Sequence, residues 1–320
     1  MKTFQKSYWF KRLPILSSNA ELWVSHMAQY WNLDIFRPQE PIDAHEVRLQ
    51  LQRYMPELLT EFDALLAASH HQRDAAQLLA MYNLPPFFSG CSVSVSHSKG
   101  HHTLIRNYDM GINEFSGVFR YEDLADGGWI IGSAEGGWGY LDGMNHHGLA
   151  VAITFGGNFR VGDGFAIPII LRYLLTTCAT VPEALERLRT IPHRLVQNIY
   201  LLDRDGRYSV AYTSPEGVTT DDGLVCCTNH QRQVQNAKHA ASTRTEERFE
   251  HLLNMAGSVA PNDFLEQPLY NLAFSEHFGT LYTVEIDPIC NTAHYHWPVG
   301  ELCVSCELPE TELEIELSGH

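Results

Sequence analysis

The fold is decided by the stretch SGCSVSVSH, which runs from Ser89 to His97. Its residues alternate, so that Cys91, Val93 and Val95 share one face and the serines share the other, a period of two that is typical of a β-strand. A glycine stands directly before the cysteine and gives the backbone freedom there. We therefore expect a thiol at the end of the first strand of a β-rich body.

The residues before this strand have a different pattern. In residues 21–36 and 44–81, leucine, tyrosine and alanine recur among charged residues at helical spacing. Two consecutive prolines, Pro85 and Pro86, end this pattern, because proline stops a helix and favours extended chain before it. The sequence thus predicts a helical leader over residues 1–90.

Beyond Pro86 the pattern changes to short strands separated by glycine. Because runs of strands alternate with a pair of helices, we expect an α+β protein in which helices cover layered sheets. Residues 142–145 are expected to form a tight turn, and residues 307–316 a solvated tail or edge. The expected strands lie at 91–97, 102–108, 117–121, 129–133, 148–155, 196–202, 208–212, 224–227, 280–286 and 294–297, and the expected helices at 165–178, 182–190 and 243–255.

Charge and composition exclude several classes of protein. Twenty-two lysines and arginines against 38 aspartates and glutamates give a net charge of −16 at pH 7, and the basic residues form no run. We therefore expect no nucleic-acid partner and no binding to an anionic membrane. An apolar fraction of 44% and a charged fraction of 19% are typical of a globular protein and not of a disordered or coiled-coil chain.

Cysteine usage and the N-terminal segment indicate a reducing compartment. Seven cysteines, of which Cys226 and Cys227 are adjacent, make a poor disulfide framework. Lys11 and Arg12 interrupt the N-terminal segment before any apolar run of signal-peptide length, and no apolar stretch of about 18 residues follows. We expect a soluble cytoplasmic protein.

Four motifs follow one another along the chain. They are Gly90-Cys91, RNYD at 106–109, DGMNHHGLA at 142–150 and TNH at 228–230. In this order they resemble the acyl-CoA:isopenicillin N acyltransferase family, a branch of the N-terminal nucleophile hydrolases that is related to the choloylglycine hydrolases. Each motif is weak alone, but the ordered set is specific, and the resemblance covers about residues 85–297.

The resemblance implies a four-layer αββα sandwich, in which stacked antiparallel sheets are covered by helices. It also implies that the chain cleaves itself between Gly90 and Cys91. On this basis we expect a leader over residues 1–90, which is retained as a subunit after cleavage. We expect the N-terminal nucleophile hydrolase domain to comprise residues 91–320.

Roles for the site residues follow from the same resemblance. It implies that Cys91 is the nucleophile and that Asp109 contacts its α-amine. It implies further that Arg106 orients the thiolate and the substrate, and that Asn229 donates to the oxyanion. A thiol has an ordinary pKa of about 8.5, and a free α-amine of about 7.7 to 8.0 on the same residue can act as its base. Cleavage after Gly90 creates that amine.

Two positions depart from the family pattern. Phe155 stands where the choloylglycine hydrolases carry a second oxyanion asparagine, and its backbone N–H could still donate there. The family also carries an arginine at the start of the helix after the TNH motif. Here Arg244 and Arg248 are both candidates for binding the substrate, and the sequence does not choose between them.

A competing kind of site lies toward the C-terminal end. Sets of cysteine and histidine can bind zinc, but a single Cys-x-x-Cys pair is weak evidence for a zinc site. We expect no metal, and the thiol chemistry requires no cofactor. The residues concerned are Cys290, His294, His296, Cys303 and Cys306.

We therefore expect a self-processing N-terminal cysteine amidohydrolase that acts on a small N-acyl amide through a Cys91 acyl-enzyme. Two alternatives stay open. The enzyme could instead transfer an acyl group, including one from a coenzyme A thioester, to an amine. The chain could also keep the fold without cleaving itself and serve as a ligand-binding module. The identity of the substrate and a homo-oligomeric state are open as well.

Overall fold

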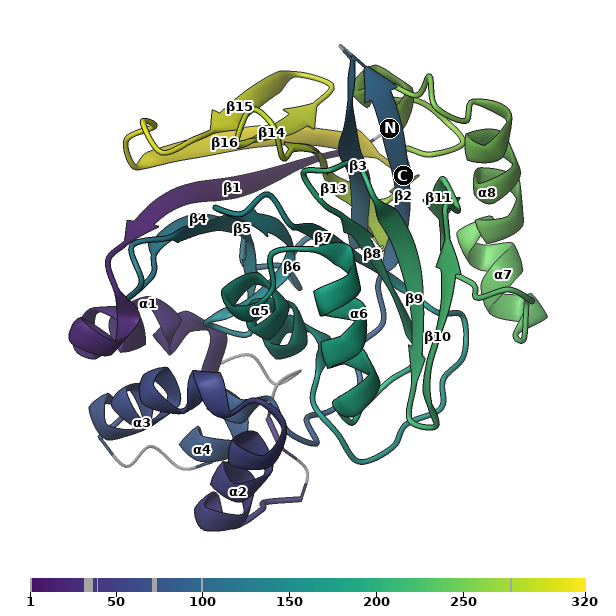
Figure 1. The fold of residues 1–320 in the computed structure, drawn as a ribbon. Coiled ribbons are helices and arrows are strands. Elements are labelled where there is room, and N and C mark those ends of the chain that lie inside the picture. The colour runs from purple at the N-terminus through teal and green to yellow at the C-terminus, as the bar shows by residue number, and fades with distance from the viewer. Residues whose placement is uncertain (1, 32–36, 39, 71–73, 99, 277) are drawn as a thin grey trace.

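The computed structural model describes residues 2–31, 37, 38, 40–70, 74–98, 100–276 and 278–320. Within this part of the chain two β-sheets lie face to face, and helices cover their outer faces (Figure 1). The α+β class and the αββα order of layers are thus confirmed.

The first sheet has nine strands and forms the larger of the two inner layers. Neighbouring strands are antiparallel except for one parallel pair, β1 with β4. In spatial order the strands are β10 (Gly217–Asp222), β9 (Tyr208–Ser214), β8 (Gln197–Leu202), β7 (Ala150–Phe155), β6 (Gly139–Asn145), β5 (Trp129–Glu135), β4 (Val118–Asp123), β1 (Lys2–Leu13) and β16 (Thr311–Gly319).

The second sheet carries the strand that begins at the Gly90-Cys91 bond, and all of its strand pairs are antiparallel. Its strands are β11 (Cys226–Cys227), β2 (Gly90–Ser98), β3 (His101–Met110), β13 (Phe278–Asp287), β14 (Thr292–Trp297) and β15 (Gly300–Val304), and β12 (Leu272–Ala273) pairs with β13 beside this order. The hairpin of β2 and β3 therefore lies between the short edge strand β11 and β13 in the layer that holds the thiol.

Helices cover the sheets from both sides. The pair α5 (Ile167–Thr177) and α6 (Val181–Thr190) packs on the nine-stranded sheet, and α7 (Ala237–Thr243) and α8 (Thr245–Asn254) lie over the β11 and β2 side of the second sheet (Figure 1). The remaining helices form a lobe next to α5. They are α1 (Ala20–Trp31), α2 (Ala44–Tyr54), α3 (Leu59–Ala68) and α4 (Ala75–Ala80).

Aromatic side chains fill much of the space between the sheets. Phe119 on β4 stacks on Tyr295 of β14 with ring centroids 3.7 Å apart, and Tyr8 on β1 lies 4.9 Å from Trp297. These rings are buried, and each buries a large apolar area. The two sheets therefore share one core, and the first strand of the chain contributes to it.

The expectation of a wholly helical leader is wrong for β1. Its inward residues Tyr8 and Phe10 are buried, while Trp9 between them is half-buried. Burial therefore alternates along the strand with a period of two. The strand pairs with β4 on one side and with β16 on the other. The leader is thus part of the nine-stranded sheet as well as of the helical lobe.

Other expected elements need smaller corrections. Residues 142–145 lie within strand β6, and the turn follows at Asn145 to Gly148, where the Gly148 N–H donates to the Asn145 carbonyl at 2.9 Å. The expected helix over 243–255 corresponds to α8 and begins at Thr245, because Arg244 adopts a positive φ of 52° and separates it from α7, which was not expected. Strand β10 was not expected. The acidic segment near the C-terminus forms the edge strand β16.

In the described part of the chain, the search for membrane spans found no helix with the length and apolar character that crossing a bilayer requires.

Candidate active site

Cys91 is the second residue of β2, and its side chain is completely buried. The hairpin of β2 and β3 places Cys91 opposite Tyr108 and Gly90 opposite Asp109. Arg106 lies two residues before Tyr108 on β3, so its side chain leaves the sheet on the same face as those of Tyr108 and Cys91. Local strand pairing therefore brings Arg106 to the thiol, and places Asp109 beside the Gly90-Cys91 bond on the opposite face of the hairpin.

Arg106 reaches the sulfur directly. One terminal guanidinium nitrogen donates to Cys91 Sγ at 3.2 Å, and Nε donates to the carbonyl of Ile153 on β7 at 3.0 Å. The other terminal nitrogen contacts Asp142 and the hydroxyl of Tyr282. This arginine is fully buried and reaches from β3 to the other sheet. Its charge is therefore stabilised by protein groups.

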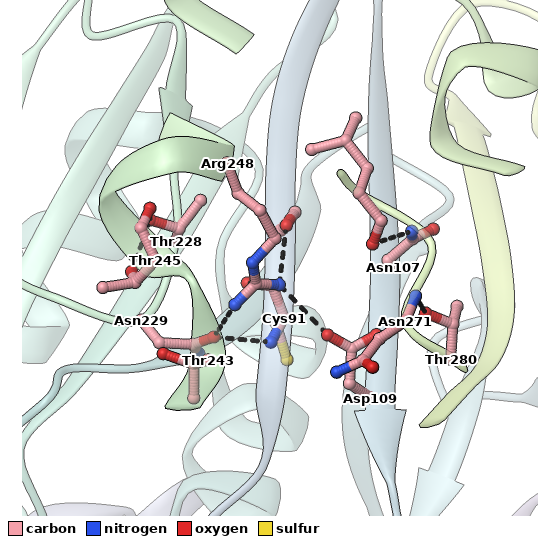
Figure 2. Close-up of polar contacts among 12 residues, drawn as sticks. Cys91, Asn107, Asp109, Thr228, Asn229, Thr243, Thr245, Arg248, Asn271 and Thr280 are labelled. Carbon is pink, nitrogen blue, oxygen red and sulfur yellow. Dashed lines mark hydrogen bonds and ion pairs between the residues drawn. The ribbon is translucent and has the colours of Figure 1, made fainter. Parts of the chain in front are cut away.

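Asn229 follows β11 and faces the backbone of Cys91. Its Oδ1 accepts the Cys91 N–H at 3.1 Å, and its Nδ2 donates to the carbonyl of Ser89 at 3.5 Å (Figure 2). The amide therefore contacts the chain on both sides of the Gly90-Cys91 bond. Oriented this way, its oxygen accepts from the nitrogen that would become the α-amine.

Arg248 on α8 closes the other side of the site. One of its terminal nitrogens lies 3.0 Å from Asp109 Oδ2 and 3.3 Å from the Cys91 carbonyl, and the other donates to Asn229 Oδ1 at 2.5 Å (Figure 2). Thr280 on β13 donates to the second oxygen of Asp109 at 2.7 Å. The carboxylate is thus held by an arginine and a hydroxyl next to the Gly90-Cys91 bond.

A hydroxyl pair fixes α8 against β11. Thr228 Oγ1 lies 2.8 Å from Thr245 Oγ1 and donates to the Thr245 carbonyl at 2.9 Å (Figure 2). Thr228 directly precedes Asn229, and Thr245 begins the helix that carries Arg248. This contact therefore helps to hold Asn229 and Arg248 within hydrogen-bonding distance of each other.

The second arginine candidate lies elsewhere. Arg244 is exposed and pairs with Glu247, with guanidinium-to-carboxylate distances of 2.7 and 2.6 Å. It occupies the junction between α7 and α8, whereas Arg248 lies one turn into α8 and faces the second sheet. Of the two arginines, Arg248 lies at the site. Sequence alone missed this because the helix break at Arg244 changes which residues face inward.

Burial governs the charge states of the site. Burial raises the pKa of the Cys91 thiol above its ordinary value; Arg106 opposes that rise and Asp109 adds to it. Burial also raises the pKa of Asp109, against the opposing effect of Arg248 and Thr280. Burial lowers the pKa of Arg248, and Asp109 opposes this change. In the intact chain the thiol is therefore mostly protonated at neutral pH.

The residues before Cys91 close the site. Ser89 Oγ lies 3.8 Å from the sulfur, and the ring of Phe88 meets Phe155 and Phe159 at centroid distances of 5.0 and 4.6 Å. Gly90 is packed so tightly that a Cβ built on it would lie 2.0 Å from the ring of Phe278. A side chain at position 90 would therefore force the ring of Phe278 to move.

Phe155 ends β7, and its ring is buried against Phe88. The function of its backbone N–H stays a prediction. Three further residues that the sequence analysis did not assign to the site contact Arg106 or its carboxylate partner: Asp142, Tyr282 and Ser133. Asp142 lies in the DGMN motif, which was the available signal, but that motif was interpreted as a turn.

The cysteines and histidines that were considered as a competing zinc site do not form one cluster among the described residues. Cys303 Sγ lies 3.1 Å from His294 Nε2 on the neighbouring strand. Among the described residues, the group whose metal-type ligand atoms lie within 4.8 Å of one another is His101, Asp287 and Cys290. His101 begins β3, at the opposite end of that strand from Asp109.

Comparison with known proteins gives a family match and several similar folds. The family model described as acyl-coenzyme A:6-aminopenicillanic acid acyl-transferase matches residues 96–300. Among curated proteins, none matches this sequence.

Three solved structures illustrate the similar folds. A mutant of conjugated bile acid hydrolase from Clostridium perfringens is 12% identical, with a TM-score of 0.45, over 72% of this chain and 98% of that one. Penicillin V acylase from Agrobacterium tumefaciens is 15% identical, with a TM-score of 0.44, over 68% and 86% of the two chains. An N-acylethanolamine-hydrolyzing acid amidase ortholog from Caenorhabditis elegans is 13% identical, with a TM-score of 0.44, over 62% and 92%.

The matched residues include the RNYD, DGMN and TNH motifs and most of both sheets, which is well over half of the chain. The chain therefore belongs to the acyl-coenzyme A:6-aminopenicillanic acid acyl-transferase family and is an enzyme of amide hydrolysis or acyl transfer.

Proposed function

We propose that this chain is a self-processing N-terminal cysteine amidohydrolase, in which residues 91–320 are the catalytic domain and residues 1–90 are the leader that is cleaved from it. One observation supports this most directly. The backbone nitrogen that cleavage would free lies 3.1 Å from Asn229 Oδ1, while the sulfur on the same residue lies 3.2 Å from Arg106. The two reactive groups of an N-terminal cysteine thus each have a partner already.

In the first stage the Cys91 sulfur attacks the carbonyl carbon of Gly90, and the carbon–nitrogen bond of that peptide breaks. The thiol proton moves to the departing nitrogen, which becomes the α-amine of Cys91, while the Gly90 carbonyl becomes a thioester. Water then cleaves the thioester: its hydroxyl joins the carbonyl carbon and its proton returns to sulfur. The products are a leader ending in a carboxylate and a domain beginning with a free cysteine.

In the second stage the α-amine takes the thiol proton, the sulfur attacks a substrate amide, and the amine returns the proton to the leaving nitrogen. Arg106 favours the thiolate through its contact with Sγ. Asn229 Nδ2, which donates to Ser89 in the intact chain, becomes available to the oxyanion once that segment moves away. Water then releases the acyl group from sulfur.

The leader stays bound after cleavage in this proposal. Strand β1 is paired on both sides, with β4 and with β16, and its loss would leave two unpaired strand edges in the nine-stranded sheet. Tyr8 and Phe10 would also leave the core. We therefore expect the two fragments to co-elute under native conditions and to separate after denaturation.

Intact mass of the purified protein tests the processing step. We expect two fragments that meet between residues 90 and 91, and a single full-length chain for Cys91→Ala. Incubation of the processed protein with a panel of N-acyl amides should release the free amine. An active preparation that consists of uncleaved chain would contradict the proposal and favour the non-processing alternative.

Net acyl transfer is a second candidate, supported by the description of the matching family as acyl-transferases. The acyl-enzyme is common to both reactions, and they differ in whether water or an amine takes the acyl group. Adding a nucleophilic amine during turnover separates them. A new amide formed in preference to the free acid would favour transfer, including transfer from a coenzyme A thioester.

We also propose a reducing location such as the cytoplasm. None of the seven cysteines, all of which lie in the described part of the chain, forms a disulfide. A thiol nucleophile is maintained most readily where the surroundings keep thiols reduced. Fractionation of cells that produce the protein, followed by detection of the processed fragments, checks the compartment.

A further inference from the structure

Asp142 lies in the middle of β6 and is completely buried between the sheets. Its Oδ2 accepts the Tyr282 hydroxyl at 2.7 Å and also contacts Arg106. Its Oδ1 accepts the Ser133 hydroxyl and, at 3.4 Å, the Ser133 backbone N–H. Both oxygens of the carboxylate are therefore satisfied, and the group is held in one orientation.

This carboxylate determines how Arg106 can point. The guanidinium is planar, and its donors form a rigid fork. Two edges of the fork are occupied, by the Ile153 carbonyl at Nε and by Asp142 with Tyr282 at one terminal nitrogen. The remaining terminal nitrogen is directed at Cys91 Sγ, 3.2 Å away. The aim at the sulfur thus depends on the contacts at the far side of the fork.

We propose that Asp142 is a positioning residue, supported by Tyr282 and Ser133, that holds the Arg106 guanidinium toward the Cys91 sulfur. The inference rests on the proposed function, because it assigns Asp142 a part in thiol chemistry. Asp142 itself contacts neither the sulfur nor the scissile bond in the hydrogen bonds of the described residues.

The alternative is that Asp142 and Arg106 form an ion pair that only stabilises the fold. A buried arginine needs an acidic partner whatever its function, because an unpaired charge in the core is costly. Glu122, on β4 of the same sheet, forms such a pair with Arg172 on α5; both are buried, and the two side chains lie 2.7 Å apart. Glu122 also accepts the hydroxyl of Tyr140 at 2.7 Å, just as Asp142 accepts that of Tyr282. Glu122→Gln is therefore a matched control away from Cys91.

The two interpretations predict opposite changes at the thiol. If Asp142 acts only as a charge, a neutral residue in its place no longer offsets the positive charge of Arg106. The thiolate is then stabilised more strongly, and the pKa of Cys91 falls. If Asp142 positions Arg106, its replacement lets the guanidinium turn away, and the pKa of Cys91 rises. The other titratable groups around the sulfur are unchanged by the substitution; they are Tyr108, Asp109, Cys227, Arg248 and, in the processed enzyme of the proposed function, the α-amine of Cys91.

The test compares processed wild-type enzyme with Asp142→Asn, which preserves the side-chain shape. Alkylation of Cys91 by iodoacetamide is followed by mass spectrometry across pH, together with kcat and KM for an amide substrate. We expect the alkylation profile to move up by about one pH unit. We also expect kcat to fall about 10- to 100-fold, as for other residues that orient a reactive group, with KM nearly unchanged.

Tyr282→Phe carries the test if the Asp142→Asn chain does not fold. This change removes one hydrogen bond from both Asp142 and Arg106, and we expect a shift of the same sign but smaller size. Glu122→Gln should lower the thermal midpoint and leave the Cys91 profile unmoved. An unchanged or lowered alkylation profile in the Asp142 or Tyr282 variant overturns the inference.

The outcomes also separate this inference from the proposed function. Retained turnover in Cys91→Ala would remove the nucleophile, and with it the proposed function. Loss of turnover in Cys91→Ala, together with an unmoved profile in Asp142→Asn, would leave the proposed function intact and remove the inference alone.

Discussion

Cys91 and Cys227 lie on neighbouring strands of the second sheet, and both thiols are buried in its core. Around Cys227 the nearest polar contact is the Thr154 hydroxyl, 3.9 Å from Sγ, and burial raises the pKa of this thiol well above its ordinary value. Around Cys91, by contrast, an arginine contacts the sulfur and an asparagine accepts the backbone N–H. Both thiols are buried, but in the described part of the chain only Cys91 has a charged side chain and an amide side chain in direct contact with it.

The difference teaches what makes a buried cysteine a candidate nucleophile. A buried thiol without charged partners is a small apolar side chain. Reactivity requires groups that stabilise the thiolate and the developing oxyanion, and these groups carry a desolvation cost that a purely structural region avoids. The polar groups around Cys91 come from β3, from the segment that follows β11 and from α8, which indicates that the region is organised around this residue.

The largest expected effect comes from exchanging the thiols for alanine. Cys91→Ala should abolish both cleavage and turnover, because no other group supplies the attacking sulfur. Cys227→Ala should leave turnover within about twofold and cost about 1–2 kcal/mol of stability through the lost packing. Intact mass, amide turnover and thermal unfolding measure these outcomes. Equal activity losses in the two variants would contradict the distinction between Cys91 as the nucleophile and Cys227 as a structural thiol.

Removing the amide tests the next feature that Cys227 lacks. Asn229→Ala deletes the proposed oxyanion donor, and we expect kcat to fall about 100- to 1000-fold. The steady-state kinetics of the processed enzyme provide the measurement. A variant that retains kcat but shows a raised KM would instead assign Asn229 to substrate binding.

The two arginines near the start of α8 provide an internal control. Arg248→Gln removes the charge that contacts Asp109 and Asn229, so we expect turnover to fall about 10- to 100-fold. Arg244→Gln removes an exposed pair with Glu247, which contributes at most about 1 kcal/mol, and turnover should stay near wild type. Comparable losses in both variants would indicate that the helix has another orientation in the enzyme.

The pH dependence of processing tests the Cys91 thiol without a substitution. Burial raises the pKa of Cys91, so the thiolate fraction of the intact chain increases with pH and continues to increase above the ordinary thiol range. Below the pKa this fraction rises about tenfold per pH unit. Freshly refolded protein should therefore process faster at pH 9 than at pH 7. A processing rate that already levels off near neutral pH would mean that Arg106 outweighs burial.

Local sequence patterns were sufficient for much of the second sheet. The alternation from Ser89 to His97 predicted β2, and the RNYD motif lay one hairpin away, so the contact of Cys91 with Arg106 and the position of Asp109 opposite Gly90 follow from short-range strand pairing. The helix at Val181 was also anticipated, since proline at its first turn is a local signal. Such features depend on residues that are close along the chain.

Long-range pairing decided the rest. Strand β1 pairs Lys2 with Gly319 and Trp9 with Val118, and neither partner can be identified from the leader itself. The choice of Arg248 over Arg244 depends on a helix break and on the contact of α8 with the second sheet.

The sequence by itself determined the order of the motifs, the thiol near the start of the first strand of the body and the α+β class, and the αββα order of layers was implied by the family resemblance. The tertiary structure alone decided that residues 2–13 join the nine-stranded sheet, that Arg248 and not Arg244 lies at the site, and that Asp142 contacts Arg106. The physical reason is that periodicity and turn residues act between near neighbours. Burial, by contrast, forces polar groups from distant strands to satisfy one another wherever the sheets meet.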